Sequence, residues 1–376
     1  MSRRTRIAVL AAVLAAAAHG LLAAQAVPRA RQLYDRAREL DRGGDAAAAL
    51  SLLWEAAGLA PADGEIQHAL GSALERIGAL DAAIDAFRAA ARAPRSPRGA
   101  SNSLVLALVK GGRSEEAIAY GRELTASAPA DADRWFTLGL AQAEVDVDGA
   151  IESFRRALTL DDRHALARYN LGLVFFRTDR FQMAIDELTR ALAIQPRPEI
   201  YYSLGTIYRH LGDLDRAAQA LADAVAANGD YADAHLALGT VYKAKGDLKR
   251  AASSLRRAAA LRPDLAAPHI VLAQTLALAR DEEGARRASA EADRLRALSQ
   301  RSQEAAALTA AGAQKLDAGD AAGAADIFRR ATQAFDAFAP AHYQLGRALQ
   351  HLGQHDAAKA AFARAQQLNP ALVPPR

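Results

Sequence analysis

Large apolar residues recur along most of the chain at spacings that predict pairs of short helices. One set falls on the first helix of each expected pair and consists of Leu70, Leu138, Leu171, Leu204, Leu238 and Leu345. A second set falls on the second helix and consists of Phe87, Phe154, Leu188, Leu221, Leu255, Phe328 and Phe362. Charged residues are spread over the remaining positions, as the solvated faces of helices require. The pattern predicts an all-α protein.

Small residues keep the same register as the large ones. Glycine recurs at intervals of 33 or 34 residues, or twice that interval, at Gly71, Gly139, Gly172, Gly205 and Gly239, and again at Gly312 and Gly346. Alanine follows twelve residues after most of these positions, and a second alanine follows seven residues later. Small side chains let two helices approach closely. We therefore expect each glycine on a first helix to face an alanine on the second helix.

Turn signals separate the expected helices. Gly-Asp or Gly-Arg pairs, such as Gly212-Asp213 and Gly246-Asp247, follow the first helices, where glycine tolerates left-handed dihedral angles. Proline closes many of the pairs, as Pro263 does, because it cannot continue a helix. Each pair is therefore expected to be a helix-turn-helix unit.

This pattern resembles the tetratricopeptide repeat family. Within residues 236–263 the resemblance rests on Leu238, Gly239, Tyr242, Gly246, Asp247, Ala251, Leu255, Ala258 and Pro263. Ten such repeats start near residues 30, 64, 98, 132, 165, 198, 232, 266, 305 and 339. The resemblance implies a right-handed α-solenoid superhelix of about ten stacked helix-turn-helix repeats.

The expected organisation has five parts. Residues 1–26 are a signal peptide, 27–299 hold repeats one to eight, 300–304 are a seam or helix extension, 305–372 hold repeats nine and ten, and 373–376 are a tail. Repeat eight is irregular, since Ala273 replaces the first-helix glycine and Arg280 the turn glycine. No glycine or proline occurs between Gly284 and Gly312, which predicts an unusually long second helix or a hinge.

The first 26 residues have the pattern of a secretory signal peptide. A basic start precedes an apolar run over residues 7–18, and a small-x-small triplet follows at residues 24–26. Cleavage after Ala26 would export the protein to the periplasm or the cell exterior. The alternative is an uncleaved helix anchored in the inner membrane, although His19 leaves the run short for a span of about 20 residues.

Charge and cysteine content exclude several classes of protein. The formal net charge is +4, but three arginines near the N-terminus contribute to it and no acid balances them before residue 27, so the mature chain carries +1. Such a balance does not favour nucleic-acid binding. The chain has no cysteine, which excludes disulfides, thiolate metal sites and cysteine nucleophiles.

No set of residues points to catalysis, a metal ion or a cofactor. His351 and His355 have a metal-ligand spacing only if they share one helix, and Gly353 marks a turn between them. Residues 144–149 imitate the first half of a calcium loop, but Arg155 stands where the closing acid belongs. We therefore expect a protein that is not an enzyme and holds no metal or cofactor.

Histidine recurs at the fourth position of several repeats. His235, His269 and His342 occupy this position, where Trp135 and Tyr201 stand in two others. A position that repeats with the helices predicts a packing role rather than a chemical one.

The resemblance also implies where a partner would bind. In this family the first helices line a concave groove that usually holds extended peptides or partner helices. In repeats four to six the corresponding stripe consists of Phe136, Leu140, Tyr169, Leu173, Phe176, Arg177, Tyr202, Thr206 and Arg209. Arg177 and Arg209 would be available to orient an acidic group. The alternative is that the aromatic side chains pack between adjacent first helices and contact no ligand.

The expected function is a non-catalytic protein–protein interaction scaffold in the bacterial cell envelope. Its partner would be a protein or peptide, with neither nucleic acid nor a small-molecule cofactor involved, and a membrane only if the signal peptide is retained. One alternative is a structural protein that self-associates through its C-terminal end or the seam of repeat eight. Another is an accessory subunit that recruits substrate for a separate envelope enzyme.

Overall fold

The computed structural model describes residues 26–369 and Leu372. The predicted signal peptide, apart from Ala26, and the predicted tail lie outside these residues. Regular structure in the described part of the chain is helical, and no strand occurs there. The same residues contain no helix with the length and apolar character needed to span a membrane. The predicted all-α architecture of paired helices is confirmed.

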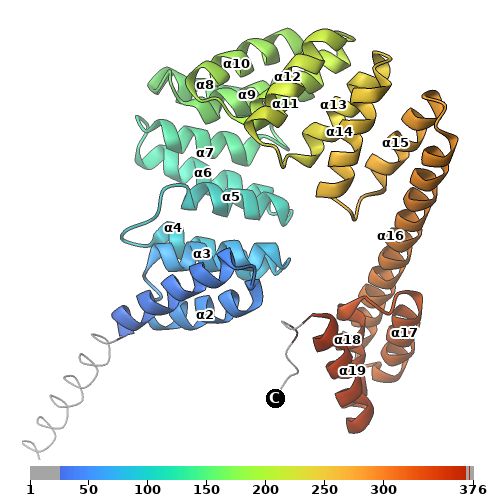
Figure 1. Ribbon diagram of the computed structural model, residues 1–376. Coiled ribbons are helices and arrows are strands. Elements are labelled where there is room, and N and C mark those ends of the chain that lie inside the picture. The colour runs from blue at the N-terminus through green and yellow to red at the C-terminus, as the bar shows by residue number, and fades with distance from the viewer. Residues whose placement is uncertain (1–25, 370–371, 373–376) are drawn as a thin grey trace, which may run out of the picture. The chain divides into compact units, whose positions relative to one another are not determined.

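The chain divides between Pro196 and Arg197 into two compact units. The first unit begins with a helix over residues 26–42. It continues with α2 (Ala46–Leu59), α3 (Gly64–Arg76), α4 (Leu80–Arg92), α5 (Ala100–Lys110), α6 (Ser114–Ser127), α7 (Ala132–Gln142), α8 (Val147–Leu160), α9 (Ala165–Arg177) and α10 (Phe181–Ile194). Consecutive helices of this unit lie side by side (Figure 1). Each repeat therefore contributes one antiparallel pair to a stack.

The second unit continues the same arrangement. Its helices are α11 (Pro198–His210), α12 (Leu214–Ala227), α13 (Ala232–Ala244), α14 (Leu248–Leu261), α15 (Ala266–Leu278), α16 (Glu282–Asp317), α17 (Ala321–Ala334), α18 (Ala339–His351) and α19 (His355–Leu368). The described helices account for all ten predicted repeats, with one departure at α16.

The glycines on first helices lie where the two helices of a repeat approach most closely. A Cβ atom added at Gly139 would lie 2.5 Å from the ring of Phe154, and one at Gly205 would lie 2.6 Å from Leu221. The close approach is confirmed. The glycine makes room for the large residue of the second helix, and the expected alanine lies beside it as well, since the Ala251 carbonyl lies 3.2 Å from a Cβ added at Gly239.

The turns between paired helices use the left-handed region of backbone dihedral angles. Gly212 and Gly246 both have φ of 77°. Repeats five and eight lack this glycine, and Asp179 and Arg280 adopt φ of 57° and 61° in its place. A side chain in this region is strained. The turn geometry is thus set by the stacking of the helices and is kept even where the residue is unfavourable.

The fourth position of five repeats fastens the loop that precedes it. The Trp135 indole donates to the carbonyl of Pro129 (2.9 Å), and the Nε2 atoms of His235 and His342 contact the carbonyls of Gly229 (3.1 Å) and Asp336 (2.9 Å). Gln67 and Arg168 make the equivalent bonds. In each case the acceptor lies six residues before the donor. The recurring histidines that make this bond have a structural role, as predicted.

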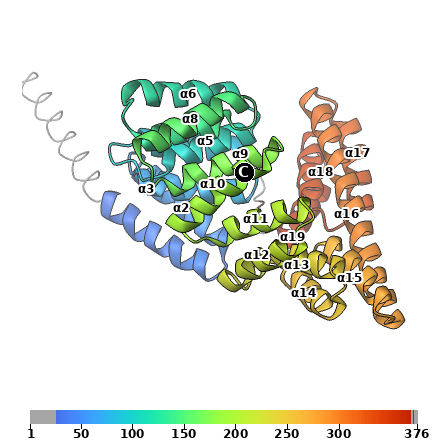
Figure 2. The same cartoon turned by 90° about the horizontal axis from the view of Figure 1, so that it is seen from above.

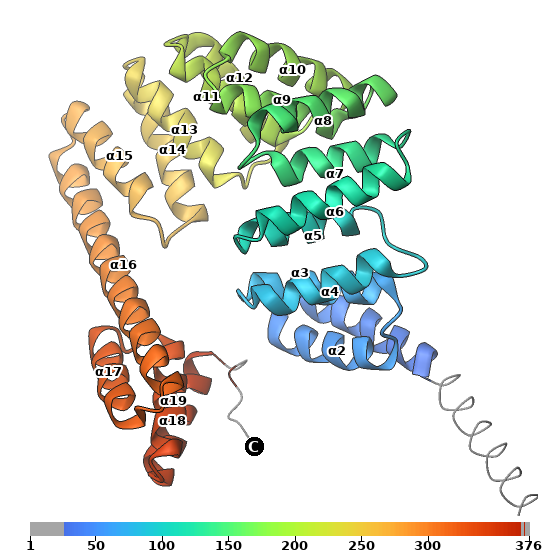
Figure 3. The same cartoon turned by 180° about the vertical axis from the view of Figure 1, so that it is seen from behind.

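Repeat eight ends in one continuous helix, α16, of 36 residues. One end of α16 lies beside α15 and the other beside α17 and α18 (Figures 2 and 3). The helix therefore combines the second helix of repeat eight with the first helix of repeat nine. The predicted unusually long helix is confirmed, and its physical cause is the absence of a turn residue between Gly284 and Gly312.

In the part of α16 that forms the first helix of repeat nine, one side is exposed that other first helices bury against a neighbouring helix. Ala307, Ala311 and Gln314 are exposed, although the equivalent residues of α9, Ala167, Leu171 and Val174, are buried. Ala311 stands where most other repeats carry leucine, and Gln314 stands where they carry small or apolar residues such as Ala141 and Val174. The sequence of α16 is thus suited to solvent contact on this side.

Candidate functional site

The first helices of the first unit carry an apolar row that is partly accessible to solvent. The ninth positions of repeats three, four and five hold Leu106, Leu140 and Leu173, which we call the leucine row. Leu106 is 52% exposed, and the other two are half-buried. Val109 and Phe176, both half-buried, stand three residues further along their helices. We call the surface that these helices form with α3 and the helix over residues 26–42 the first-helix face.

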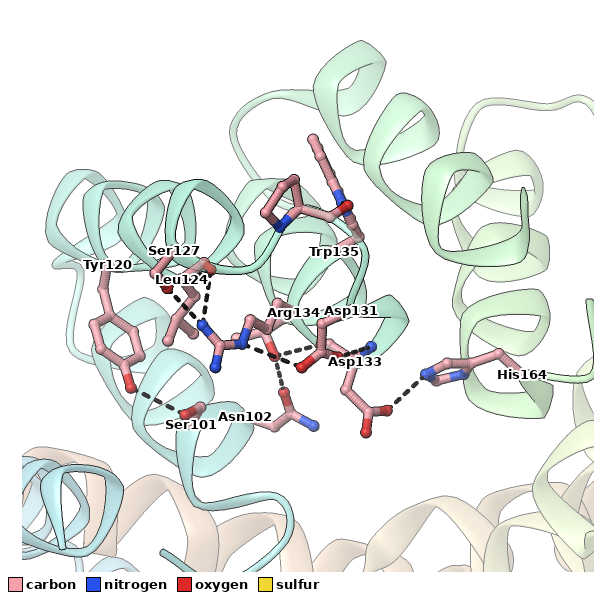
Figure 4. A network of polar contacts seen from close by, with 12 residues as sticks. Ser101, Asn102, Tyr120, Leu124, Ser127, Asp131, Asp133, Arg134, Trp135 and His164 are labelled. Carbon is pink, nitrogen blue, oxygen red and sulfur yellow. Dashed lines mark hydrogen bonds and ion pairs between the residues drawn. The ribbon is translucent and has the colours of Figure 1, made fainter. Parts of the chain in front are cut away.

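Hydrogen bonds between neighbouring first helices hold them in register along one edge of this face. The Thr137 hydroxyl donates to Asn102 on α5 (2.5 Å), and the His164 imidazole pairs with Asp133 on α7 (3.1 Å). Figure 4 shows the contact between His164 and Asp133. His68 and Ser103 make the corresponding contact between α3 and α5 (2.9 Å), and burial lowers the pKa of His68, so its ring is neutral near pH 7. Leucines at equal positions therefore lie in one continuous row.

Ion pairs occupy the opposite edge of the same face. Arg76 pairs with Asp41 (2.7 Å), and Lys110 donates to Glu75 (3.0 Å). Arg177 donates to Glu144 (2.7 Å) and to the carbonyl of Ala143. An acidic group of a partner would therefore compete with Glu144 for Arg177, and the role expected of Arg177 stays a prediction. The leucine row lies between two edges whose polar groups are bonded to one another.

A polar network behind the row fixes α5, α6 and α7. The Arg134 guanidinium donates to the Leu124 carbonyl (3.1 Å), to the Ser127 hydroxyl (2.5 Å) and to Asp131 (3.2 Å). Ser101 on α5 contacts the Tyr120 hydroxyl on α6 (2.9 Å). These contacts gather at the ends of the helices around the loop before α7 (Figure 4). The apolar row is thus presented by helices whose spacing is fixed.

The structure separates the predicted groove residues of the first unit into packed and accessible positions. Phe136 is only 4% exposed, and its ring lies 4.9 Å from the His164 ring and 6.0 Å from the Phe154 ring. Its place in the binding stripe is corrected, since it fills the space between helices. Leu140, Tyr169, Leu173 and Phe176 keep part of their surface accessible.

The remaining predicted groove residues belong to the second unit and form a group of their own on α11. Tyr202 lies 5.2 Å from the Tyr231 ring, and the Thr206 hydroxyl donates to the Tyr202 carbonyl (2.9 Å). Arg209 is exposed. The stripe expected from the sequence is therefore divided between the two compact units. The candidate site lies on the first unit.

Sequence reasoning missed Leu106 and Val109. Both occupy inward positions of repeat three, whereas the sequence reasoning considered these positions in repeat two and in repeats four to seven. The repeat register alone could have found them, because Leu106 stands 34 residues before Leu140.

The histidine and acidic motifs have other partners. His351 is the last residue of α18 and His355 the first of α19, so the two lie on different helices. Asp146 accepts a bond from the backbone N–H of Gly149 (3.0 Å) at the start of α8, and Glu144 is held by Arg177. The described residues contain no cluster of three or more histidines and acids that could hold a metal ion.

Models of the tetratricopeptide repeat match most of the chain. One matches residues 34–100, 102–162, 140–199 and 202–266, and a second matches residues 339–372. The stretch between them includes α16. No curated protein matches the chain.

Several solved structures are similar to parts of the chain. YrrB, described as a TPR protein with an unusual peptide-binding site, is 22% identical over 46% of this chain and 91% of its own, with a TM-score of 0.42. A thermophilic TPR protein of Thermus thermophilus, TTC0263, is 26% identical over 47% and 98%, with a TM-score of 0.41. PilF of Pseudomonas aeruginosa is 20% identical over 53% and 91%, with a TM-score of 0.47.

Proposed function

The chain belongs to the tetratricopeptide repeat family, and from this premise we propose that it is a non-catalytic scaffold that binds a polypeptide along its leucine row. Proteins of this family bind protein or peptide partners and are generally without catalytic activity, and the match to it supports a protein–protein interaction scaffold. The first-helix face corresponds to the groove that the family uses.

The observation that carries the proposal is the partly accessible leucine row. It lies between two edges whose polar side chains already bond to one another. Burying apolar surface contributes about 25 cal/mol per Å². The charged groups along the edges already have partners within the first unit. A partner would therefore be held mainly through apolar side chains, and an amphipathic helix that presents a stripe of them meets this requirement.

We place this activity in the cell envelope, where the N-terminal pattern would direct the chain. The support is the basic start, the apolar run and the small-x-small triplet before Val27. N-terminal sequencing of the protein purified from its source tests this placement. A chain that begins at Val27 and is found in the envelope fraction supports export with cleavage. A chain that retains residues 1–26 contradicts cleavage, and one that is found only in the cytoplasmic fraction contradicts the placement.

The binding proposal is tested by capture with the mature protein and two charge substitutions, Leu106→Glu and Leu173→Glu. Each puts a charge into the row, and loss of a central apolar contact typically costs about 2 kcal/mol or more of binding free energy. We expect capture of the partner to fall at least about tenfold for either variant.

Leu211→Glu is the matched control, because Leu211 is 49% exposed and lies outside the row. Circular dichroism should show that all three variants keep their helix content. Undiminished capture by both row variants would contradict the proposal.

A further inference from the structure

A pocket of about 420 Å³ lies between α8, α9 and α10. Arg168, Leu171 and Phe175 of α9 line it, and their spacing places them on one side of that helix. Tyr169, Leu173 and Phe176 are also spaced by three and four residues and lie on another side, so the pocket and the leucine row use different faces of α9. Its volume falls within the range of about 300–1,000 Å³ typical of small-molecule sites.

The pocket has an apolar wall because repeat five departs from the repeats that follow. In repeats six and seven an arginine covers a tyrosine ring, with Arg216 4.7 Å from the Tyr208 ring and Arg250 4.5 Å from the Tyr242 ring. The residue equivalent to these arginines in repeat five is Met183. Its side chain lines the pocket and is 40% exposed. An apolar side chain is thus exposed where repeats six and seven place an arginine.

Two of the three arginines around the pocket share one carboxylate. Arg168 donates to Glu187 (2.9 Å) and to the Asp162 carbonyl (2.8 Å), and Arg190 lies 3.4 Å from Glu187. The remaining acid, Asp186, accepts a hydrogen bond from the Gln182 amide (2.9 Å).

Arg155 is the exception among the lining residues. Its guanidinium lies 6.0 Å from the centre of the Phe175 ring, and no carboxylate in the described part of the chain pairs with it. The pocket therefore combines an apolar wall with Arg155, and its three arginines outnumber its two acids, Asp186 and Glu187, by one. The planar donors of a guanidinium suit a carboxylate.

We propose that this pocket binds a carboxylate carried on an apolar group. The carboxylate pairs with Arg155, and the apolar group packs against Met183 and Leu158. Two sources offer this chemistry: a free aliphatic acid, and the C-terminus of a polypeptide that ends in an apolar residue. The pocket is independent of the leucine row, so the chain carries a second binding site on its second-helix side.

Calorimetric titration of the full chain with two pairs of probes tests the proposal and separates the sources. Octanoate represents the free acid and N-acetyl-leucine the chain end, and octanamide and N-acetyl-leucinamide are their uncharged controls. We expect at least one carboxylate to bind, and its amide to bind at least about tenfold more weakly, because a hydrogen bond to a charged group contributes more than a neutral one. Binding by one carboxylate identifies the source, and binding by both shows that the pocket accepts either.

Substitutions locate the binding. Arg155→Gln and Met183→Glu should each weaken the carboxylate at least about tenfold, whereas Arg156→Gln, an exposed neighbour outside the pocket, should leave it unchanged. Both pocket side chains are partly accessible, and unfolding curves will show whether the variants fold. The proposal is overturned if neither carboxylate binds, or if Arg155→Gln and Arg156→Gln have equal effects.

Discussion

The residue at the eighth position of a repeat sets how closely its two helices approach. At Gly139 an added Cβ would lie 2.5 Å from the Phe154 ring, closer than any real contact of this kind. Phe154 is fully buried, so its ring has nowhere to move. The single hydrogen of glycine is thus a packing requirement in this repeat, even though glycine inside a helix is unfavourable for the backbone.

A pair of glycine substitutions measures this requirement. Gly139→Ala should lower the free energy of unfolding by about 1–3 kcal/mol, because it overpacks a rigid site. Gly58→Ala, on the exposed side of α2 with no atom within 4 Å of the new methyl group, should raise it by about 0.5–1 kcal/mol. Urea unfolding checks both values, and equal effects of the two would show that helix spacing does not depend on Gly139.

At the scale of the element, aspartates at helix starts tie stability to pH. Hydrogen bonds from the backbone N–H and then the guanidinium of Arg250 lower the pKa of Asp247, and Arg216 does the same for Asp213. A carboxyl whose pKa is lower in the folded chain stabilises it above the unfolded value of about 3.9. That contribution is lost as the pH falls through the lower folded pKa.

The pH dependence can be assigned with Asp247→Asn. The variant should have a lower Tm than the unmodified chain near about pH 6, and the difference should close as the pH falls below about 4. Asp223→Asn, inside α12, controls for the loss of one surface carboxylate. A difference in Tm that stays constant down to low pH would contradict the role of the Asp247 carboxylate.

The continuity of α16 is a second property at this scale. Ser299 is exposed and lies in the middle of this helix, far from both of its ends. Ser299→Pro should destabilise the second unit by about 3 kcal/mol, whereas Ser299→Ala should be neutral or slightly stabilising. Thermal unfolding followed by circular dichroism measures both, and a proline variant as stable as the alanine variant would mean that the helix is interrupted in solution.

At the scale of the whole molecule, the repeat register made most of the fold predictable. The positions of Gly139 and Phe154 recur with the repeats, so each predicted helix pair is found at its expected residues, and the missing turn after Gly284 predicted α16. The environment of the candidate site was less predictable. The burial of Phe136 depends on His164, and the pairing of Arg177 depends on Glu144, both contacts across neighbouring repeats. The pattern of a single repeat does not determine which side chains of a neighbouring repeat contact it.

The proposed scaffold is tested most directly by photo-crosslinking from the leucine row. A photoreactive residue is placed at Leu106, at Leu173 or, as a control, at Trp54, which is 52% exposed on a second helix. The account predicts that Leu106 and Leu173 give crosslinks to the same partner polypeptide and that Trp54 gives none. Crosslinks to the captured partner from Trp54 alone would contradict it.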